Sequence, residues 1–298
     1  MALPPGEDRI TSDVQKARAE ARAEAPRNVM SVDVEDWFCV HNLSRHIPYD
    51  AWDRCESRVE RSTGVLLDLF GRHGVEATFF VLGWVADRFP DLVREIDRRG
   101  HELATHGYSH RLLTAMQPEE FRADLQRSLA VLAPLTGQEI RGFRAPSFSL
   151  TKRTLWALDI LREAGIRYDS SVFPVAFHPD YGIPDAQLAP HTLAGLIELP
   201  MGVAEVFGRR IPCSGGGYFR LYPYALTRSL MRHVNRQGRP VMFYLHPWEA
   251  DPTQPRVSGL PRSKRFRHYN NLDKTAERLE RLLSEFTFTS ARRLIAGG

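Results

Sequence analysis

The feature that most constrains the fold is a series of short, continuously apolar segments that alternate with helix-like segments. Residues 77–82 read Ala-Thr-Phe-Phe-Val-Leu and residues 241–245 read Val-Met-Phe-Tyr-Leu, with almost no polar side chain to face water. A strand of this kind is buried on both faces, which is typical of parallel strands covered by helices. The repeated order of strand and helix therefore predicts a parallel α/β architecture.

Seven segments fit such strands, and six fit the helices between and after them. The predicted strands are 29–34, 77–82, 102–105, 140–144, 167–169, 196–201 and 241–245. The predicted helices are about 61–70, 87–99, 118–132, 151–164, 224–237 and 273–286, several of them closed by a glycine. Seven strands predict an α/β fold of the TIM-like type, an incomplete (β/α)7 barrel, in which chemistry sits at the C-terminal ends of the strands.

The predicted elements form one domain, residues 28–298. Residues 1–27 are rich in Ala, Arg and Glu and have no apolar core of a secretory signal, so a disordered or loosely helical N-terminal arm is expected. No apolar run approaches the roughly 18 residues of a membrane span. Cys39, Cys55 and Cys213 show no C-x-x-C spacing, which indicates reduced thiols and a cytoplasmic protein.

The charge balance does not favour a nucleic-acid partner. The chain has 40 Lys and Arg against 36 Asp and Glu, a formal net charge of +4, and nearly all of its bases are Arg. No groove-reading module is visible, so no nucleic acid is expected as a partner.

Ionisable side chains gather where the predicted strands end. The first strand runs into Asp33, Glu35 and Asp36, and the third is followed by His106 and His110. Imidazoles four residues apart can face the same way if a helical turn opens there. Two imidazoles with a carboxylate suit a divalent metal, Zn²⁺ first, with Co²⁺, Ni²⁺ or Fe²⁺ as alternatives. Three acids exceed what a metal requires, so one can act as a general base.

Three further polar residues, Arg144, Asp169 and His246, end the fourth, fifth and seventh predicted strands. All these ends meet at one edge of a parallel barrel. The pattern therefore predicts a catalytic site rather than scattered surface charge.

By these residues the chain resembles the polysaccharide deacetylases, carbohydrate esterase family 4 with the NodB-homology domain. The resemblance covers about residues 29–290. Its motifs appear in the family's order: Ser31-Val32-Asp33 with the acids that follow, His106-Gly107-Tyr108-Ser109-His110, Arg144-Ala145-Pro146, a weaker match at 169–173, and Leu245-His246. The sequences of five segments resemble the bacterial branch of the family found with exopolysaccharide and exosortase (PEP-CTERM) loci. The segments are 33–37, 144–148, 215–220, 246–249 and 267–273.

The chain departs from the family in its first motif. The usual motif has adjacent aspartates, the first the base and the second a metal ligand, but here Val34 follows Asp33. Some relatives use a D-x-D variant, which makes Glu35 the ligand on the same strand face as Asp33. Asp36 can serve instead if the chain leaves strand geometry after Val34. Both remain open, with Glu35 favoured.

The resemblance implies a metal-assisted amide hydrolysis. His106, His110 and one acid would hold the metal. Asp33 would take the proton of the attacking water, and Arg144 would pair with Asp33 to keep it ionised and aimed.

The remaining roles also follow from the resemblance. The backbone N–H of Ser147 would belong to the oxyanion hole. His246 would give a proton to the leaving amine, as a histidine near its ordinary pKa can. Asp169 would orient either His246 or Arg144.

Four aromatic residues are candidates for substrate binding: Trp37, Phe148, Tyr218 and Trp248. By type they belong to the core, but any that line the mouth would suit stacking on a pyranose. Residues 252–272 carry Arg256, Arg262, Lys264, Arg265 and Arg267 without Asp or Glu. This segment should overhang the mouth, either as a solvated loop or as a contact for an anionic or lipid-linked glycan at a membrane surface.

The predicted function is removal of acetyl groups from N-acetylhexosamine units of a bacterial exopolysaccharide or its lipid-linked precursor. Two alternatives stay open: hydrolysis of a small cyclic amide or imide on the same scaffold, and a metal-free carbohydrate-binding pseudoenzyme. Release of acetate from N-acetylated oligosaccharides distinguishes them.

Overall fold

The predicted strands join one parallel sheet because their side chains are apolar on both faces. The computed structural model describes residues 28–176 and 182–297, so the arm predicted for residues 1–27 lies outside the described residues. The parallel strands, in order across the sheet, are β10 (Met242–Leu245), β1 (Asn28–Val34), β2 (Thr78–Val81), β3 (Glu102–Thr105), β4 (Gly142–Phe143), β5 (Tyr168–Asp169) and β7 (Leu196–Glu198).

The sheet curls into an incomplete barrel. Every residue of β1, β2, β3 and β10 is buried, and β1 pairs in parallel with both β10 and β2. An isolated parallel bridge joins Met201, just beyond β7, to Met242 at the start of β10. The predicted α/β fold, an incomplete (β/α)7 barrel of parallel strands, is therefore confirmed, and each predicted strand is present.

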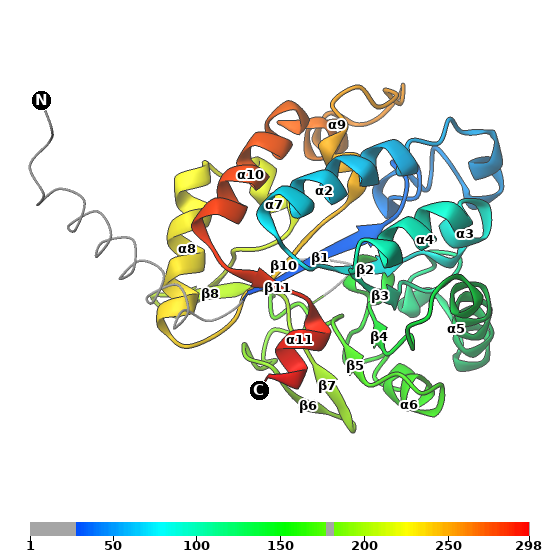
Figure 1. The fold of residues 1–298 in the computed structure, drawn as a ribbon, viewed down its shortest axis with the longest axis horizontal. Coiled ribbons are helices and arrows are strands. Elements are labelled where there is room, and N and C mark those ends of the chain that lie inside the picture. The colour runs from blue at the N-terminus through cyan, green and yellow to red at the C-terminus, as the bar shows by residue number, and fades with distance from the viewer. Residues whose placement is uncertain (1–27, 177–181, 298) are drawn as a thin grey trace, which may run out of the picture.

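Helices cover the outside of the sheet (Figure 1). Those that match predicted helices are α2 (Val59–His73), α3 (Gly83–Arg88), α4 (Pro90–Arg98), α5 (Pro118–Leu132), α6 (Ala157–Glu163), α8 (Tyr224–Arg236) and α10 (Thr275–Glu285). α5 begins with a capping box between Gln117 and Glu120, which satisfies free N–H groups of its first turn. The helix predicted for 87–99 is divided into α3 and α4, because Pro90 cannot continue a helix.

Several elements were not predicted: β6 (His191–Leu193), β8 (Val203–Val206), β9 (Arg209–Pro212), β11 (Phe288–Thr289), α7 (Gly216–Leu221), α9 (Arg262–Tyr269) and α11 (Ala291–Ala296). Short 3-10 helices are η1 (His41–Leu43), η2 (Tyr49–Arg54), η3 (Leu113–Ala115), η4 (Ala133–Leu135), η5 (Pro146–Phe148), η6 (Pro247–Ala250) and η7 (Leu272–Lys274). Helix α9 was not predicted because it has no apolar stripe: only His268 and Tyr269 of its residues are buried.

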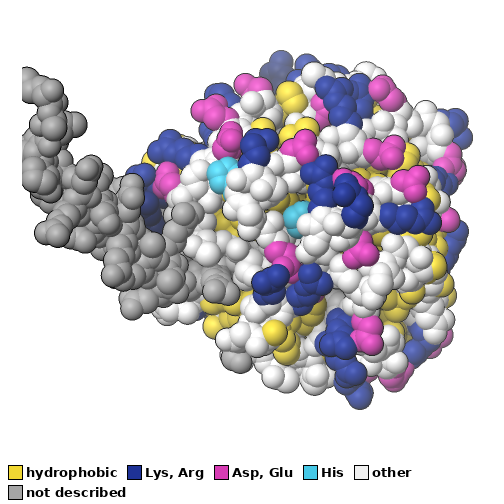
Figure 2. All heavy atoms as spheres, viewed as in Figure 1, with side chains coloured by type: hydrophobic (Ala, Val, Ile, Leu, Met, Phe, Trp, Pro, Cys, Tyr) yellow, Lys and Arg dark blue, Asp and Glu magenta, His cyan; other side chains and the backbone are white. Residues whose placement is uncertain are grey.

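The surface carries interleaved charges of both signs on the face seen in Figure 2. Many belong to exposed ion pairs, such as Arg99 with Asp68 at 2.7 Å. In the part of the chain that the structure describes, no helix combines the length and the apolar character needed to cross a bilayer.

Candidate active site

The polar side chains at the strand ends meet in one pocket at the C-terminal edge of the barrel. The predicted site residues that line it are Asp33, Glu35, His106, His110, Ser147, Phe148, His246 and Trp248. Residues of the η1 segment form one side of the wall, and Arg267 and His268 of α9 form another. The strand-end pattern of the sequence thus corresponds to a single pocket.

Arg144 holds Asp33 in the floor of this pocket. Its Nη1 lies 2.6 Å from Asp33 Oδ1, and the exposed fractions of the two side chains are 0% and 2%. The same guanidinium donates to Ser31 Oγ, to the Ser170 carbonyl and to Ser170 Oγ, each at 3.0 Å, and it lies over the Phe80 ring at 4.0 Å. A guanidinium bound at so many points cannot swing away, so the expected Arg144–Asp33 pair keeps one orientation.

Glu35 lies between two imidazoles. Its Oε2 is 2.8 Å from His110 Nε2, and its Oε1 is 3.1 Å from His246 Nε2. The contact with His110 lacks the angles of a hydrogen bond, so Oε2 is a buried oxygen without a hydrogen-bond partner. Burial alone would raise the pKa of Glu35, but the neighbouring imidazoles together lower it, His110 most strongly. The carboxylate is therefore ionised.

His106 presents the nitrogen that a metal needs. Its Nδ1 lies 2.8 Å from the Arg144 carbonyl, and because a carbonyl only accepts, Nδ1 carries the proton and Nε2 keeps its lone pair. Burial, and then the nearby His110, hold the pKa of His106 well below its ordinary value, so the ring is neutral. The ring centroids of the two histidines are 5.4 Å apart.

Glu35, His106 and His110 fit a divalent metal by their chemistry. One carboxylate oxygen and two imidazole nitrogens form a donor set typical of catalytic zinc. Two ligands of a tetrahedral ion lie roughly 3.3 Å apart when each bond is about 2.0 Å, close to the 2.8 Å that separates Glu35 from His110. Within residues 28–176 and 182–297, no three such side chains are arranged to hold an ion as they stand, so binding would require small rotamer changes.

Asp36, the alternative acidic ligand, is a cap for the start of α2. Its Oδ2 accepts from Ser57 Oγ at 2.6 Å and from the N–H groups of Arg58 and Val59 at 2.9 and 3.2 Å. Its Oδ1 accepts from the N–H of Trp37 at 2.9 Å. Both oxygens are occupied and Asp36 does not line the pocket. Of the two acids left open by the sequence, only Glu35 faces the two histidines.

The turn between the two histidines is held by Asp124 of α5. The carboxylate accepts from the N–H of Tyr108 at 2.7 Å and from the N–H and Oγ of Ser109 at 3.1 and 2.5 Å. Gly107 has a φ of 72°, and a Cβ there would lie 2.9 Å from Asp124 Oδ2. A side chain at position 107 would therefore displace the carboxylate that sets the spacing of the imidazoles.

His246 is anchored by Glu249. Its Nδ1 and its backbone N–H both donate to Glu249 Oε2, at 2.9 and 3.0 Å, and its Nε2 faces the pocket at 3.9 Å from Asp33 Oδ2. Burial alone would lower the pKa of His246, but the surrounding carboxylates, Glu35 first, raise it to about 9. The pKa thus lies above the nearly ordinary value expected from the sequence, because these carboxylates favour the protonated ring.

Asp169 contacts neither His246 nor Arg144, so the orienting role expected for it is wrong. Its Oδ1 accepts from Ser171 Oγ at 2.5 Å, and its carboxyl group lies beside that of Glu198. Burial and the neighbouring Asp169 raise the pKa of Glu198 well above its ordinary value, and burial raises that of Asp169. Two buried carboxyl groups side by side disfavour ionisation of both, and Glu198 Oε1 accepts from the N–H of Val172 at 3.1 Å, which holds the chain after β5.

Ser147 occupies a strained position in the pocket wall. Its φ is 52°, and that of Phe148 is 54°. A left-handed backbone at residues other than glycine costs on the order of 1–3 kcal/mol and is concentrated at functional sites. The conformation turns the backbone after Pro146 into the pocket lining. The oxyanion role of the Ser147 N–H stays a prediction.

The two tryptophans predicted for substrate binding are structural. Trp37 is 5% exposed and its Nε1 donates to the Glu56 carbonyl at 3.0 Å, so the prediction for this residue is wrong. Trp248 lines the pocket but stacks against His246 and His268, with ring centroids 5.2 and 4.5 Å apart. Its indole forms part of the wall and is not an open platform for a sugar.

The other two aromatic candidates differ from each other. Phe148 lines the pocket and packs edge-on against Tyr244, with ring centroids 4.6 Å apart. Tyr218 is half-buried and does not line this pocket. Its ring lies tilted against that of Phe173, with ring centroids 6.2 Å apart.

Sequence reasoning did not assign roles to Glu249 and Arg220. Arg220 Nε donates to Glu249 Oε1 at 2.8 Å, and both side chains are at most 2% exposed. A signal for Glu249 was present, because it follows His246 by three residues with a proline between them, which is the spacing of a capping box. Arg220 is distant in sequence and showed no such signal.

Comparison with known proteins gives two family models on successive parts of the chain. One, described as "Polysaccharide deacetylase", matches residues 49–168, and the other, "Domain of unknown function (DUF3473)", matches residues 170–296. The first contains His106, His110 and Arg144, and the second contains His246 and Glu249. Asp33 and Glu35 precede both.

Similar curated proteins match over part of their length. A peptidoglycan-N-acetylglucosamine deacetylase of Bacillus cereus is 34% identical over 98 residues, 33% of this chain and 36% of that protein. A chitooligosaccharide deacetylase of Rhizobium leguminosarum bv. trifolii is 31% identical over 109 residues, 33% of this chain and 51% of that protein. The chain thus spans between about a third and a half of such relatives.

A solved structure shares the fold over most of both chains. It is a Mycobacterium smegmatis protein assigned to the polysaccharide deacetylases, with a TM-score of 0.59, 21% identity, and coverage of 92% of this chain and 91% of that one. The likeness extends through both matched segments, which therefore form one barrel.

Proposed function

We propose that this chain, which contains a polysaccharide deacetylase domain, is a metal-dependent N-deacetylase. Its substrate would be the N-acetylhexosamine units of a bacterial exopolysaccharide or of the lipid-linked precursor. Relatives named as peptidoglycan and chitooligosaccharide deacetylases support an acetamido group on a sugar polymer as the bond that is cleaved. The cytoplasmic location predicted from the sequence stays a prediction.

The observation that carries the proposal is the meeting of a carboxylate and an imidazole in one pocket. Asp33 Oδ2 and His246 Nε2 lie 3.9 Å apart. Arg144 holds the first from behind and Glu249 holds the second, so both inner atoms stay turned toward the same space. Amide hydrolysis needs this combination, because water must lose a proton and the amine must gain one as it leaves.

Glu35, His106 and His110 would hold the metal, which when bound supplies a Lewis acid for the acetyl carbonyl and acidifies water. Asp33 accepts a proton from the water molecule while the water oxygen bonds to the carbonyl carbon. The N–H of Ser147 stabilises the charge on the carbonyl oxygen. When the C–N bond breaks, its electron pair stays on nitrogen and His246 Nε2 delivers a proton there, which leaves acetate and a free amine.

The exposed basic side chains of helix α9 support the proposal that the substrate is anionic or lipid-linked. Arg262, Arg265 and Arg267 are exposed, and Arg267 borders the pocket. Lys264 Nζ donates to the Asn42 carbonyl at 3.2 Å, which ties α9 to the η1 side of the wall. Each basic group close to an anionic surface adds about 1 kcal/mol of attraction, and salt weakens it.

The test is release of acetate from N-acetylglucosamine oligomers by protein that has been stripped with a chelator and reloaded with Zn²⁺, Co²⁺ or Ni²⁺. We expect activity only after reloading. Hydrolysis of a cyclic imide without acetate release from any oligomer would replace the proposal with the small-amide alternative. Sugar binding without metal uptake or hydrolysis would identify a pseudoenzyme.

The recruitment by α9 is tested separately. Replacement of the exposed arginines of α9 by glutamine should lower the rate on anionic or lipid-linked acceptors and leave neutral oligomers unaffected. An equal response of the two substrate classes, or a preference that salt does not change, would refute this part.

A further inference from the structure

We propose that Glu249 and Arg220 position the general acid His246. All three residues belong to 170–296, the segment matching a domain of unknown function. The inference rests on the proposed function, which requires a proton donor for the leaving amine. The two residues act through His246 and are positioning residues.

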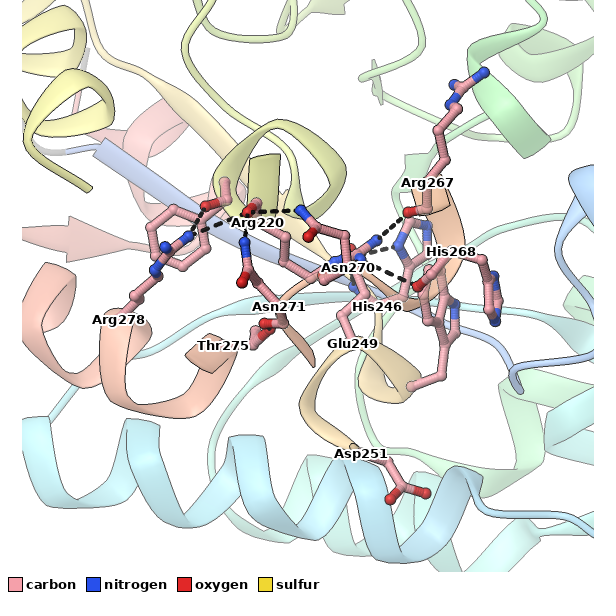
Figure 3. Close-up of polar contacts among 12 residues, drawn as sticks. Arg220, His246, Glu249, Asp251, Arg267, His268, Asn270, Asn271, Thr275 and Arg278 are labelled. Carbon is pink, nitrogen blue, oxygen red and sulfur yellow. Dashed lines mark hydrogen bonds and ion pairs between the residues drawn. The ribbon is translucent and has the colours of Figure 1, made fainter. Parts of the chain in front are cut away.

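Glu249 sets both the rotamer and the tautomer of His246. Its Oε2 accepts from Nδ1 at 2.9 Å and from the backbone N–H of the same histidine at 3.0 Å. Its Oε1 accepts from Arg220 Nε at 2.8 Å (Figure 3). With the Nδ1 proton committed to Oε2, Nε2 is the nitrogen that faces the pocket. A carboxylate used in this way keeps an imidazole in one tautomer and stabilises its protonated form.

Arg220 connects Glu249 to the α9 side of the pocket wall. Its Nη1 donates to the carbonyls of His268 and Asn270 at 3.1 and 2.8 Å, and its Nη2 donates to the carbonyl of Arg267 at 3.2 Å (Figure 3). These carbonyls lie at the C-terminal end of α9, where helical partners run out. The buried Arg220 guanidinium therefore caps the C-terminal end of α9, which borders the pocket. The same guanidinium binds the Glu249 carboxylate, which orients His246.

Gly216 is an independent sign that α7 is shaped around Glu249. A Cβ at position 216 would lie 1.7 Å from Glu249 Oε2 and 2.4 Å from Oε1. Any side chain there would push the carboxylate away from His246. Helix α7 thus contacts the Glu249 carboxylate in two ways. Arg220 donates a hydrogen bond to it, and the missing side chain of Gly216 leaves room for it.

The test compares two substrates that differ in their leaving group. An N-acetylglucosamine oligomer leaves as an amine that must be protonated, whereas 4-nitrophenyl acetate has a leaving group that needs no proton. We expect Glu249→Gln to lower the rate on the oligomer by about 10²–10⁴-fold, the usual contribution of general-acid help, while the ester rate changes little. Arg220→Gln and Gly216→Ala should change the ratio of the two rates in the same direction.

Arg278→Gln is the matched control. Arg278 lies close to Arg220 (Figure 3). Its Nη1 donates to the carbonyls of Phe219, Arg220 and Tyr222 at 2.9, 3.2 and 3.2 Å. It is an arginine that binds the backbone of α7 and its C-terminal end without contacting Glu249. Its replacement should therefore leave the ratio of oligomer rate to ester rate as in the unaltered protein.

A second readout does not depend on turnover. A downfield proton resonance of the His246 Nδ1–H, bonded to a carboxylate, should be present in the unaltered protein and in Arg278→Gln and should move upfield in Glu249→Gln, because a neutral amide oxygen is a weaker acceptor than a carboxylate. If the unaltered protein releases no acetate, the proposed function fails, but this resonance still tests the positioning.

Two results would overturn the positioning role. One is an equal loss of oligomer and ester rates in Glu249→Gln and Gly216→Ala, which would mean that the pair only maintains the fold. The other is an Nδ1–H resonance whose position is the same in Glu249→Gln as in the unaltered protein. Should Arg220→Gln fail to fold, Arg220→Lys, which keeps a charge near Glu249 but cannot reach the three carbonyls together, takes its place.

Discussion

Replacement of Asp36 by asparagine tests the proposal that Glu35, and not Asp36, would bind the metal. The Asp36 carboxylate accepts three hydrogen bonds at the start of α2 through Oδ2 and one from Trp37 through Oδ1. An amide can keep the three bonds with its oxygen, but its NH₂ group then faces the buried N–H of Trp37. An unpaired buried donor costs about 1–3 kcal/mol. For a domain of this size, 2 kcal/mol corresponds to a fall in Tm of roughly 3–4 °C.

Glu35→Gln is the matched counterpart. Glu35 contacts His110 and His246 in the pocket and caps no helix. We expect Glu35→Gln to lose metal with little change in Tm of the metal-free protein, and Asp36→Asn to lose Tm with full metal occupancy. Thermal unfolding followed by circular dichroism, together with elemental analysis of reloaded protein, gives both quantities. A variant at position 36 that melts normally and binds no metal would refute the assignment of Glu35.

Three further predictions follow from contacts in and near the site. Asp33→Asn should keep metal and lose acetate release, whereas His106→Ala should lose both; metal loss in Asp33→Asn, seen by elemental analysis, would contradict a role as base. Asp124→Asn should weaken zinc affinity by about 10–100-fold in a calorimetric titration, because it holds the turn between the ligands; unchanged affinity would exclude that role. Burial lowers the pKa of His101 to about 4, so protons favour the unfolded chain and the free energy of unfolding should fall by about 3 kcal/mol from pH 6.5 to 4. His101→Asn, which keeps an acceptor for the Ala77 N–H, should flatten that dependence in denaturant titrations, and an unchanged slope would contradict it.

The barrel could be predicted because burial on both faces leaves a direct trace in the sequence. Strands such as Thr78–Val81 and Met242–Leu245 have no polar face, and their order along the chain implies parallel pairing. Helix α9 leaves no such trace, since most of its side chains are exposed and its C-terminal end is held by the distant Arg220. Short elements that depend on a tertiary contact cannot be recognised from local pattern alone.

For the site, strand-end position predicted which residues meet but not which atoms pair. Asp36 follows Glu35 directly, yet the chain turns after β1 and commits Asp36 to the start of α2. Asp169 was expected to orient either His246 or Arg144, but His246 Nδ1 donates to Glu249, three residues further along the chain. Such choices depend on backbone direction over one or two residues, which composition and spacing do not specify.

The buried ionic groups of the site are arranged with alternating charge. From one side of the pocket to the other, the successive contacts are 2.6, 3.9, 2.9 and 2.8 Å, along the series Arg144, Asp33, His246, Glu249 and Arg220. Burying charge is costly, and well-packed apolar side chains in place of a buried ion pair are often neutral or stabilising. Stability alone therefore does not explain this series. Its two ends are arginines fixed by several acceptors each. Asp33 Oδ2 and His246 Nε2 lie in the middle, where Glu35 Oε1 is also 3.1 Å from Nε2. The proposed base and the proposed acid are thus held from opposite sides, with each arginine bonded to the carboxylate next to it.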